Sequence, residues 1–315
     1  MTQGQRLAGL LALTTVLSGC FFQGKEGGLD RSPRPPPAPP APVSVSPRSA
    51  ESLAAETYYR QVEATLRSRG LMRVDVAPRD APFATHQLIE NFIHVALYDE
   101  YSAFGGTYIA QTRASRLRRW EVPVRMSVSF GDSVPLAQRA HDKAMITAYA
   151  GQLAGATRHP VSVGDEAANF DVLVVNEDER RALGPRLMQL VPGIDAASVT
   201  AITSLAPSTF CVVFAFSKGN APAYNHAVAV IRAEHPELLR RSCVHEELAQ
   251  GLGLANDYPH ARPSVFNDDE EFALLTRHDE LLLRMLYDPR LRPGMTEAEA
   301  RPIITDIATE LTGGS

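Results

Sequence analysis

A short polar motif between residues 246 and 256 has the spacing of side chains that act together in chemistry. Glu246 and Gln250 are four residues apart, so on a helix they lie one turn apart on one face. Glu247 follows the first of them, and Gly253 can bend the chain so that Asn256 returns toward that face. If this face held a metal ion, Glu247 could act as a general base beside a metal-bound water.

This spacing resembles the motif of the metzincin zinc peptidases, His-Glu-x-x-His-x-x-Gly-x-x-His. The resemblance places Glu246, Gln250 and Asn256 at the three zinc-ligand positions and Glu247 at the general-base position. Catalytic zinc is held by imidazole, thiolate or carboxylate, whereas Gln250 and Asn256 offer neutral amides. We therefore expect no cofactor, and we keep zinc or another divalent cation as the alternative.

The chain after the motif extends the resemblance. Ser264 and Phe266 lie in a segment, residues 263–267, that stands where metzincins have a Met-turn, with Phe in place of Met. Gly253, Ser264 and Phe266 are therefore expected to have structural roles. The stretch from Cys243 through Met295 resembles an uncharacterised family of bacterial secreted proteins, domain of unknown function 2927. Glu-Glu-x-x-Gln-x-x-Gly-Leu-x-Asn-Asp and Leu-Tyr-Asp-Pro-Arg-Leu-x-Pro-Gly-Met carry this resemblance, which covers about residues 120–311.

Two other interpretations of the motif stay open. Glu246, Glu247 and Gln250 could form a solvated helix face opposite a row of leucines, as most charged helix faces do. Alternatively, a hard cation such as calcium could be held by oxygen atoms, and the candidate ligands are Glu246, Asn256, Asp257, Asp268 and Asp269. His245 is expected on the helix surface, because the residue four positions on is Ala249.

The order of elements predicts an α/β (α+β) fold. Helices are expected over residues 51–69, from Thr85, over 134–154, near 177–190, and from Pro236 through Leu254; a loop is expected over 98–108. Strands are expected over 71–76, 122–128, 161–163, 171–175, 211–216 and 227–231. This alternation places helices on a twisted, mixed, mostly parallel sheet, and the metzincin resemblance adds a helical C-terminal subdomain. The expected core includes Leu248, Leu252, Val213, Phe214, Val228, Val230, Leu282 and Leu286.

The N-terminus predicts export and a lipid anchor. Arg6 precedes a short apolar run that ends in Leu17-Ser18-Gly19-Cys20, which resembles a bacterial lipoprotein signal. The resemblance implies a signal peptide over 1–19 and acylation of Cys20, so membrane lipid is one expected partner; the alternative is an ordinary signal peptide with an incidental cysteine. Phe21 after the cysteine favours the outer membrane, facing the periplasm.

The rest of the chain divides into three segments. Residues 20–50 form a linker with seven prolines between Pro33 and Pro42, which favours an extended polyproline conformation. Residues 51–118 are expected as an extension and 119–315 as the metzincin-like domain. The net charge of −5 and the pI near 6.0 argue against nucleic acid as a partner. Cys211 and Cys243 remain as an even pair, which an oxidising compartment favours as a disulfide, the alternative being two buried thiols.

Two functions from different classes follow. The first is a peptide- or protein-binding module on the cell envelope, and the second is a metallopeptidase with a Glu/Gln/Asn ligand set. In both, Glu246, Gln250 and Asn256 should converge beside Glu247 at the floor of a cleft lined by the strand at 227–231. An extended chain could bind there by strand addition.

Overall fold

A computed structural model describes residues 46–104 and 107–313. Residues Ser44–Ser315 form one compact unit. The signal peptide, Cys20 and most of the proline-rich linker predicted above lie outside the described residues. Within the described part of the chain, no helix has both the length and the apolar character needed to cross a bilayer.

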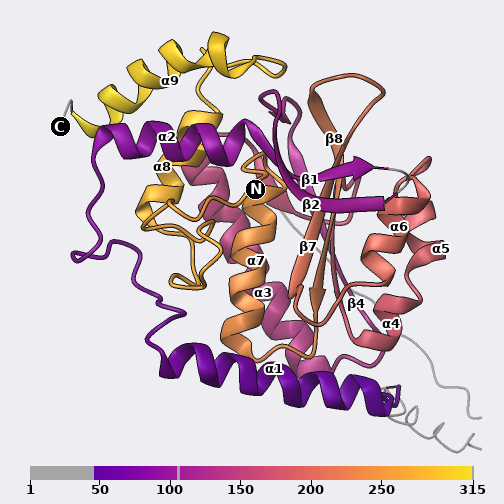
Figure 1. The fold of residues 1–315 in the computed structure, drawn as a ribbon. Helices are drawn as coiled ribbons and strands as arrows, with labels where there is room; N and C mark the ends of the chain where they lie inside the picture. The colour runs from indigo at the N-terminus through magenta and orange to yellow at the C-terminus, as the bar shows by residue number, and fades with distance from the viewer. Residues whose placement is uncertain (1–45, 105–106, 314–315) are drawn as a thin grey trace, which may run out of the picture. The chain divides into compact units, whose positions relative to one another are not determined.

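A mostly parallel sheet forms the centre of the larger unit (Figure 1). Its strands lie in the order β3 (Arg119–Trp120), β8 (Ala223–Arg232), β6 (Phe170–Val175), β4 (Val124–Phe130) and β5 (Val161–Val163). These five strands are parallel, and β7 (Cys211–Ser217) pairs antiparallel with β8, with Cys211 opposite Ile231. The mixed, mainly parallel sheet predicted from the sequence is therefore confirmed.

Along the central strands, alternate side chains point to opposite faces of the sheet and pack into two different hydrophobic cores. On β6, Val172 and Val174 pack into the larger core, whereas Leu173 and Val175 pack into a smaller one on the opposite face. The larger core is completed by α3 (Leu136–Thr157), α7 (Glu237–Gln250) and α8 (Arg277–Leu286). The smaller core is completed by α5 (Gly184–Leu190) and α6 (Ala196–Thr203), which follow the short helix α4 (Glu177–Arg181). Helices therefore cover both faces of the sheet, as Figure 1 shows.

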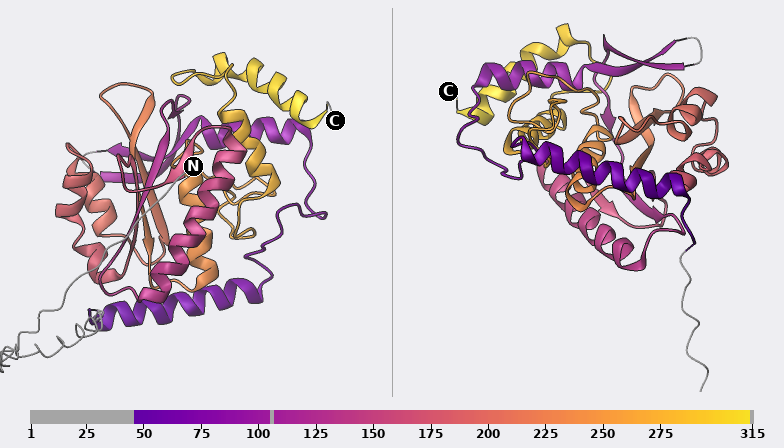
Figure 2. Two further views of the ribbon diagram at one scale, coloured as in Figure 1. Left: turned by 180° about the vertical axis from the view of Figure 1, so that it is seen from behind. Right: turned by 60° about the horizontal axis from the view of Figure 1, so that its bottom comes forward.

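Helices from the two ends of the described chain complete the unit. Near the C-terminus, α9 (Glu297–Thr312) packs on α2 (Thr85–Ala96) and α8 (Figure 2). At the other end of the described chain, α1 (Ala50–Ser68) crosses the first turn of α7. There the Glu63 carboxylate accepts a hydrogen bond from the Leu239 N–H at 3.0 Å. Tyr59 of α1 packs with Met72 and Leu239 in a third core. The boundary expected at residue 118 stays a prediction.

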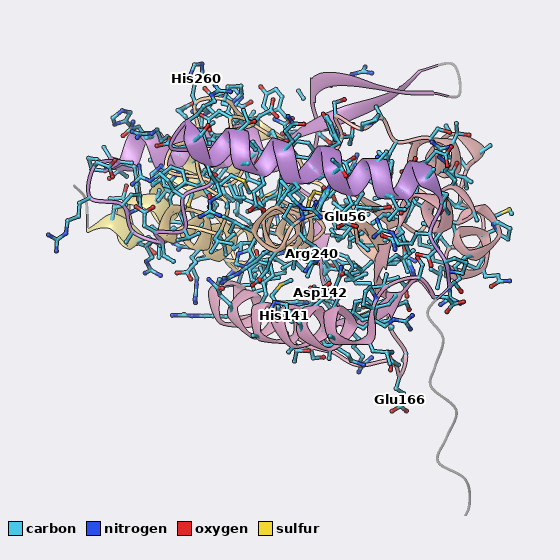
Figure 3. All side chains as sticks on the ribbon, turned by 90° about the horizontal axis from the view of Figure 1, so that it is seen from below. Glu56, His141, Asp142, Glu166, Arg240 and His260 are labelled. Carbon is cyan, nitrogen blue, oxygen red and sulfur yellow. A yellow bond between two sulfur atoms is a disulfide. The ribbon has the colours of Figure 1, made fainter. Side chains whose placement is uncertain are left out.

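A buried ion pair fixes α7 against α3. The Arg240 guanidinium lies 2.9 Å from the Asp142 carboxylate, and both residues are buried. Figure 3 shows the two side chains between the helices that carry them. A buried charge pair of this kind is costly to break because the remaining partner keeps an uncompensated charge. It therefore holds the helix that carries the polar motif at a fixed place along α3.

Several details differ from the sequence predictions. The segment predicted as a loop over 98–108 is an antiparallel hairpin of β1 (Tyr98–Phe104) and β2 (Thr107–Ala114). The strand predicted over 71–76 is reduced to one bridge between Arg73 and Phe272. The motif helix ends at Gln250 instead of Leu254.

Most of the predicted core is confirmed. Leu248, Leu252, Val228, Val230, Leu282 and Leu286 are all buried. Val213 and Phe214 are only partly buried, because β7 lies at the edge of the sheet and has a strand on one side only.

Candidate functional site

A cleft of about 330 Å³ lies between β7 and α7. One wall is the loop and strand of residues 208–215, and the other is formed by the last turns of α7 and the chain that follows it. The polar motif therefore does line a cleft. The strand beside it is β7, and the expectation that residues 227–231 would line it is wrong. Those residues lie on β8, which is paired on both sides and buried.

A disulfide ties the two walls together. Cys211 at the start of β7 is bonded to Cys243 in the middle of α7, with 5.8 Å between their Cα atoms. The predicted disulfide is thereby confirmed. Both cysteines are buried, so the bond belongs to the wall of the cleft and not to its open surface. It fixes β7 relative to the helix turn that presents the motif.

The last turns of α7 direct three predicted residues into the cleft. Glu246, Glu247 and Gln250 all line it, with Glu246 partly exposed and the other two buried. The Gln250 side-chain amide donates a hydrogen bond to the Asp257 carboxylate at 3.1 Å. Asp257 therefore returns to the helix at the place where the sequence analysis had expected Asn256.

Asn256 does not join this group, which corrects the expected convergence. Its side-chain N–H donates to the backbone oxygen of His94 at 2.9 Å, and its own N–H donates to that of Val95. The side chain is almost fully buried against α2. Asn256 thus fastens the chain after the bend to a neighbouring helix, and the adjacent residue faces the cleft.

Gly253 makes the bend. Its φ of +125° is one that residues with a side chain rarely adopt. A Cβ atom at this position would lie 2.3 Å from the backbone oxygen of Arg118, which real contacts do not allow. A glycine is needed here on both grounds, and the bend it permits sets the course of the cleft's second wall.

One carboxylate, that of Asp279, holds the turn at residues 263–267 by hydrogen bonds. Asp279 at the start of α8 accepts the Ser264 hydroxyl at 2.5 Å and the Val265 N–H at 3.1 Å. It also accepts the backbone N–H and the hydroxyl of Thr276, which caps α8. Phe266 is fully buried in the larger core. Ser264 and Phe266 therefore hold this turn in place, and neither of them lines the cleft.

The loop after this turn supplies an acid with a raised pKa, Glu270. Asp268 and Glu270 line the cleft, and each has a φ of 60°, a backbone conformation that is strained for residues with side chains. The backbone oxygen of Glu270 accepts the Met72 N–H at 2.7 Å, which fixes the loop. Burial, followed by the nearby charges of Asp268 and Asp269, raises the pKa of Glu270 to about 7.

Comparison with known proteins gives one match. A family model described as "Protein of unknown function (DUF2927)" matches residues 85–306. The chain belongs to the DUF2927 family. The family region begins at residue 85, earlier than the expected start near residue 120, and it takes in α2 and the β1–β2 hairpin. No curated protein and no solved structure gives a match.

Every residue that lines the cleft falls within the DUF2927 region, whereas α1 precedes it. Two acidic residues of the cleft were missed by the sequence analysis, Asp99 and Glu270. Glu270 belongs to a run of four acidic residues from Asp268 to Glu271, a signal that could have been used. Asp99 had no such signal, because only the hairpin brings it to the cleft.

The cleft is strongly acidic. It contains one guanidinium, that of Arg118, which lies 3.6 Å from the Asp99 carboxylate. Six carboxylates line it, those of Asp99, Glu246, Glu247, Asp257, Asp268 and Glu270. Neighbouring carboxylates of one sign create a potential that attracts cations. Among the described residues, no three His, Cys, Asp or Glu side chains form a group able to hold a metal ion. A hard-cation site stays a prediction.

His245 corrects another expectation, because it is buried and not on the helix surface. Its Nδ1 atom accepts the Leu275 N–H at 3.1 Å, and its ring stacks on Tyr149. Burial, and to a lesser extent the charge of Arg241, lowers the pKa of His245 to about 3. The imidazole is therefore neutral, faces away from the cleft, and joins α7 to the segment before α8.

Proposed function

We propose that the cleft binds an extended, positively charged segment of a peptide or protein as an added strand on β7. The observation that carries the proposal is the position of the acidic cleft along a strand at the edge of the sheet. Within the described residues β7 pairs with β8 alone, so one side of its backbone is open to a further strand. Backbone hydrogen bonds would supply affinity, and the carboxylates would select side chains.

The charge of the cleft argues for lysine or arginine in the bound segment. Glu246 and Asp257 come from the wall opposite β7, where they would meet side chains of an added strand. Acidic side chains in that strand would be repelled, and burying them beside like charges is unfavourable. The bound chain is therefore expected to alternate basic residues toward the cleft with other residues on its far face.

The test uses two labelled peptides of about eight residues, a common strand length. One alternates Val with Lys, and the other alternates Val with Glu. Fluorescence anisotropy should give saturable binding of the lysine peptide that weakens with added salt, and no binding of the glutamate peptide. Methylating alternate backbone nitrogens of the lysine peptide should also abolish binding, since it removes the donors needed for strand pairing.

Variants locate the binding on this face. Replacing Glu246 by Gln together with Asp257 by Asn should weaken the lysine peptide about tenfold, as expected for the loss of two charge-assisted contacts. Glu166→Gln is the matched control, because this exposed carboxylate projects from another part of the unit (Figure 3). Equal affinity for the N-methylated and unmethylated peptides would refute strand addition and leave only electrostatic attraction.

A metal-dependent peptidase is the alternative, and the donor set argues against it. No histidine lines the cleft, and its one cysteine, Cys211, is in the disulfide. Gln250 offers an amide already used by Asp257, and Asn256 points elsewhere. Elemental analysis of chelator-washed protein should give no stoichiometric zinc. One zinc per chain that is lost in Glu246→Ala together with peptide cleavage would establish an unusual metallopeptidase.

We further propose that the protein is held at the cell envelope by lipid on Cys20. Leu17-Ser18-Gly19-Cys20 and the proline-rich segment after it support this location. Envelope proteins with extended, basic segments would then be the natural partners of the cleft.

A further inference from the structure

A second cleft lies where α3 and α8 both end, and it shares no residue with the acidic one. It encloses about 440 Å³. Its lining includes three guanidiniums, those of Arg119, Arg158 and Arg284, and the imidazole of His159. The two clefts of this chain therefore carry opposite charge.

The floor of the second cleft is rigid. The Arg119 guanidinium carbon lies over the Tyr287 ring, 5.6 Å from the ring centre. The centre of the His159 ring lies 4.9 Å from the same point. Arg119 donates to the backbone oxygens of Leu286, Asp288 and Leu291 at 2.6, 3.0 and 2.9 Å. Arg119 is thus held in place by the end of α8, and its charge contributes to the cleft without being free to move.

Arg284 has a donor that nothing in the described structure uses. Its Nη2 atom donates to the backbone oxygen of Gly155 at 2.7 Å, which fixes the guanidinium beside the end of α3. Its Nη1 atom is buried and lacks a hydrogen-bond partner among the described residues. Buried donors are rarely left without an acceptor, and Arg284 lines the cleft, so its guanidinium would gain one by turning toward a ligand held there.

Arg158 occupies a strained position at the rim. It follows α3 with φ 57° and ψ 19°, and its N–H donates to the Ala154 oxygen at 2.9 Å. Helices that end in this left-handed conformation strongly favour glycine, with asparagine next. With an exposed arginine here the folded protein is less stable than it would be with glycine. This cost points to a functional role for the Arg158 side chain.

The acidic residues of the cleft do not cancel its charge. The Asp288 carboxylate is already bound by Arg290, with contacts of 2.9 and 3.0 Å to its two oxygens. Glu121 is exposed to solvent, which screens its charge.

We infer that the second cleft binds a phosphate group, held between Arg158 and Arg284. A phosphate group carries more negative charge than a carboxylate and has three or more oxygens that point in different directions, so it suits two guanidiniums that approach from different elements.

The test is calorimetric titration of the full folded protein at constant ionic strength with inorganic phosphate, glycerol 3-phosphate and acetate. Saturable one-to-one binding of either phosphate compound, and none of acetate, supports the inference. Tighter binding of glycerol 3-phosphate identifies a phosphate ester such as a lipid headgroup as the ligand. Tighter binding of inorganic phosphate identifies the free ion. Acetate that binds as tightly as both phosphate compounds, or no saturable binding at all, overturns the inference.

Arg158→Gly separates binding from folding. It should weaken phosphate binding about tenfold or more through loss of a charge-assisted contact, while raising the melting temperature because glycine suits this backbone. Arg186→Ala, which removes an exposed arginine of α5, is the control and should change neither. Unchanged phosphate affinity in Arg158→Gly would overturn the inference, whatever its melting temperature.

Discussion

Glu270 is the residue at which cleft charge and stability are coupled. Its folded pKa of about 7 lies above the ordinary 4.5, mainly through burial and then through Asp268 and Asp269. For a raised pKa the contribution to stability is fully present below the unfolded value and is lost as the pH rises through the folded value. Ionised Glu270 therefore destabilises the protein above neutral pH.

Glu270→Gln should stabilise the protein at high pH only. The amide keeps the size of the side chain and removes the charge, so urea unfolding near pH 8 should give about 1–2 kcal/mol more stability than wild type. Near pH 4 the two proteins should be about equal, because Glu270 is then protonated in both states. Glu166→Gln serves as control. An equal gain at both pH values would mean that charge is not the cause.

The same titration bears on the proposed ligand. Because Glu270 gains charge between about pH 6 and 8, a basic peptide should bind more tightly as the pH rises through this window.

At the residue scale the sequence could indicate Glu246, Glu247 and Gln250, since helical spacing fixes which side chains share a face. It could not decide between Asn256 and Asp257, because a bend of unknown angle lies between them and α7. Nor could it predict that Leu275 covers His245.

At the scale of elements, the bend after α7 is the feature on which the cleft's second wall depends. Gly253→Ala should cost about 2–4 kcal/mol in urea unfolding, because the new Cβ meets the Arg118 oxygen and the φ of +125° is strained. Gly151→Ala is the matched control. This glycine lies in α3 with open space around it, so alanine should add about 0.5–1 kcal/mol. A loss below about half a kcal/mol for Gly253→Ala would contradict the role assigned to the bend.

Periodicity predicted most elements, and its failures have physical causes. The strands and helices from Val124 to Gln250 follow from runs of buried aliphatic residues and from the helical pattern, except for α6, which the sequence analysis missed. The β1–β2 hairpin was missed because Gly105 and Gly106 interrupt an aromatic stretch, and such a break also fits a loop. The motif helix was extended too far because Leu252 and Leu254 continue the apolar pattern, although the chain has already turned at Gly251 and Gly253.

At the scale of the whole molecule, neither cleft could be predicted from the sequence alone. The acidic cleft joins Asp99 and Arg118 to residues that begin with Ser208, far along the chain, and the basic cleft joins the ends of α3 and α8. Such sites depend on how elements pack, and local patterns carry no information on that. The sequence did predict the disulfide that links two walls of the acidic cleft, because an expected export signal and an even pair of cysteines favoured it.

The proposed location is tested at the same scale. Cys20→Ala removes the thiol that lipid would modify, so the protein should move from the membrane fraction to the soluble periplasmic fraction and lose labelling by a clickable fatty acid. Ser18→Ala keeps a small residue before the cysteine and should leave both unchanged. A Cys20→Ala protein that stays in the membrane fraction would contradict the proposed lipid anchor, and the two clefts would become the first surfaces to test for its attachment.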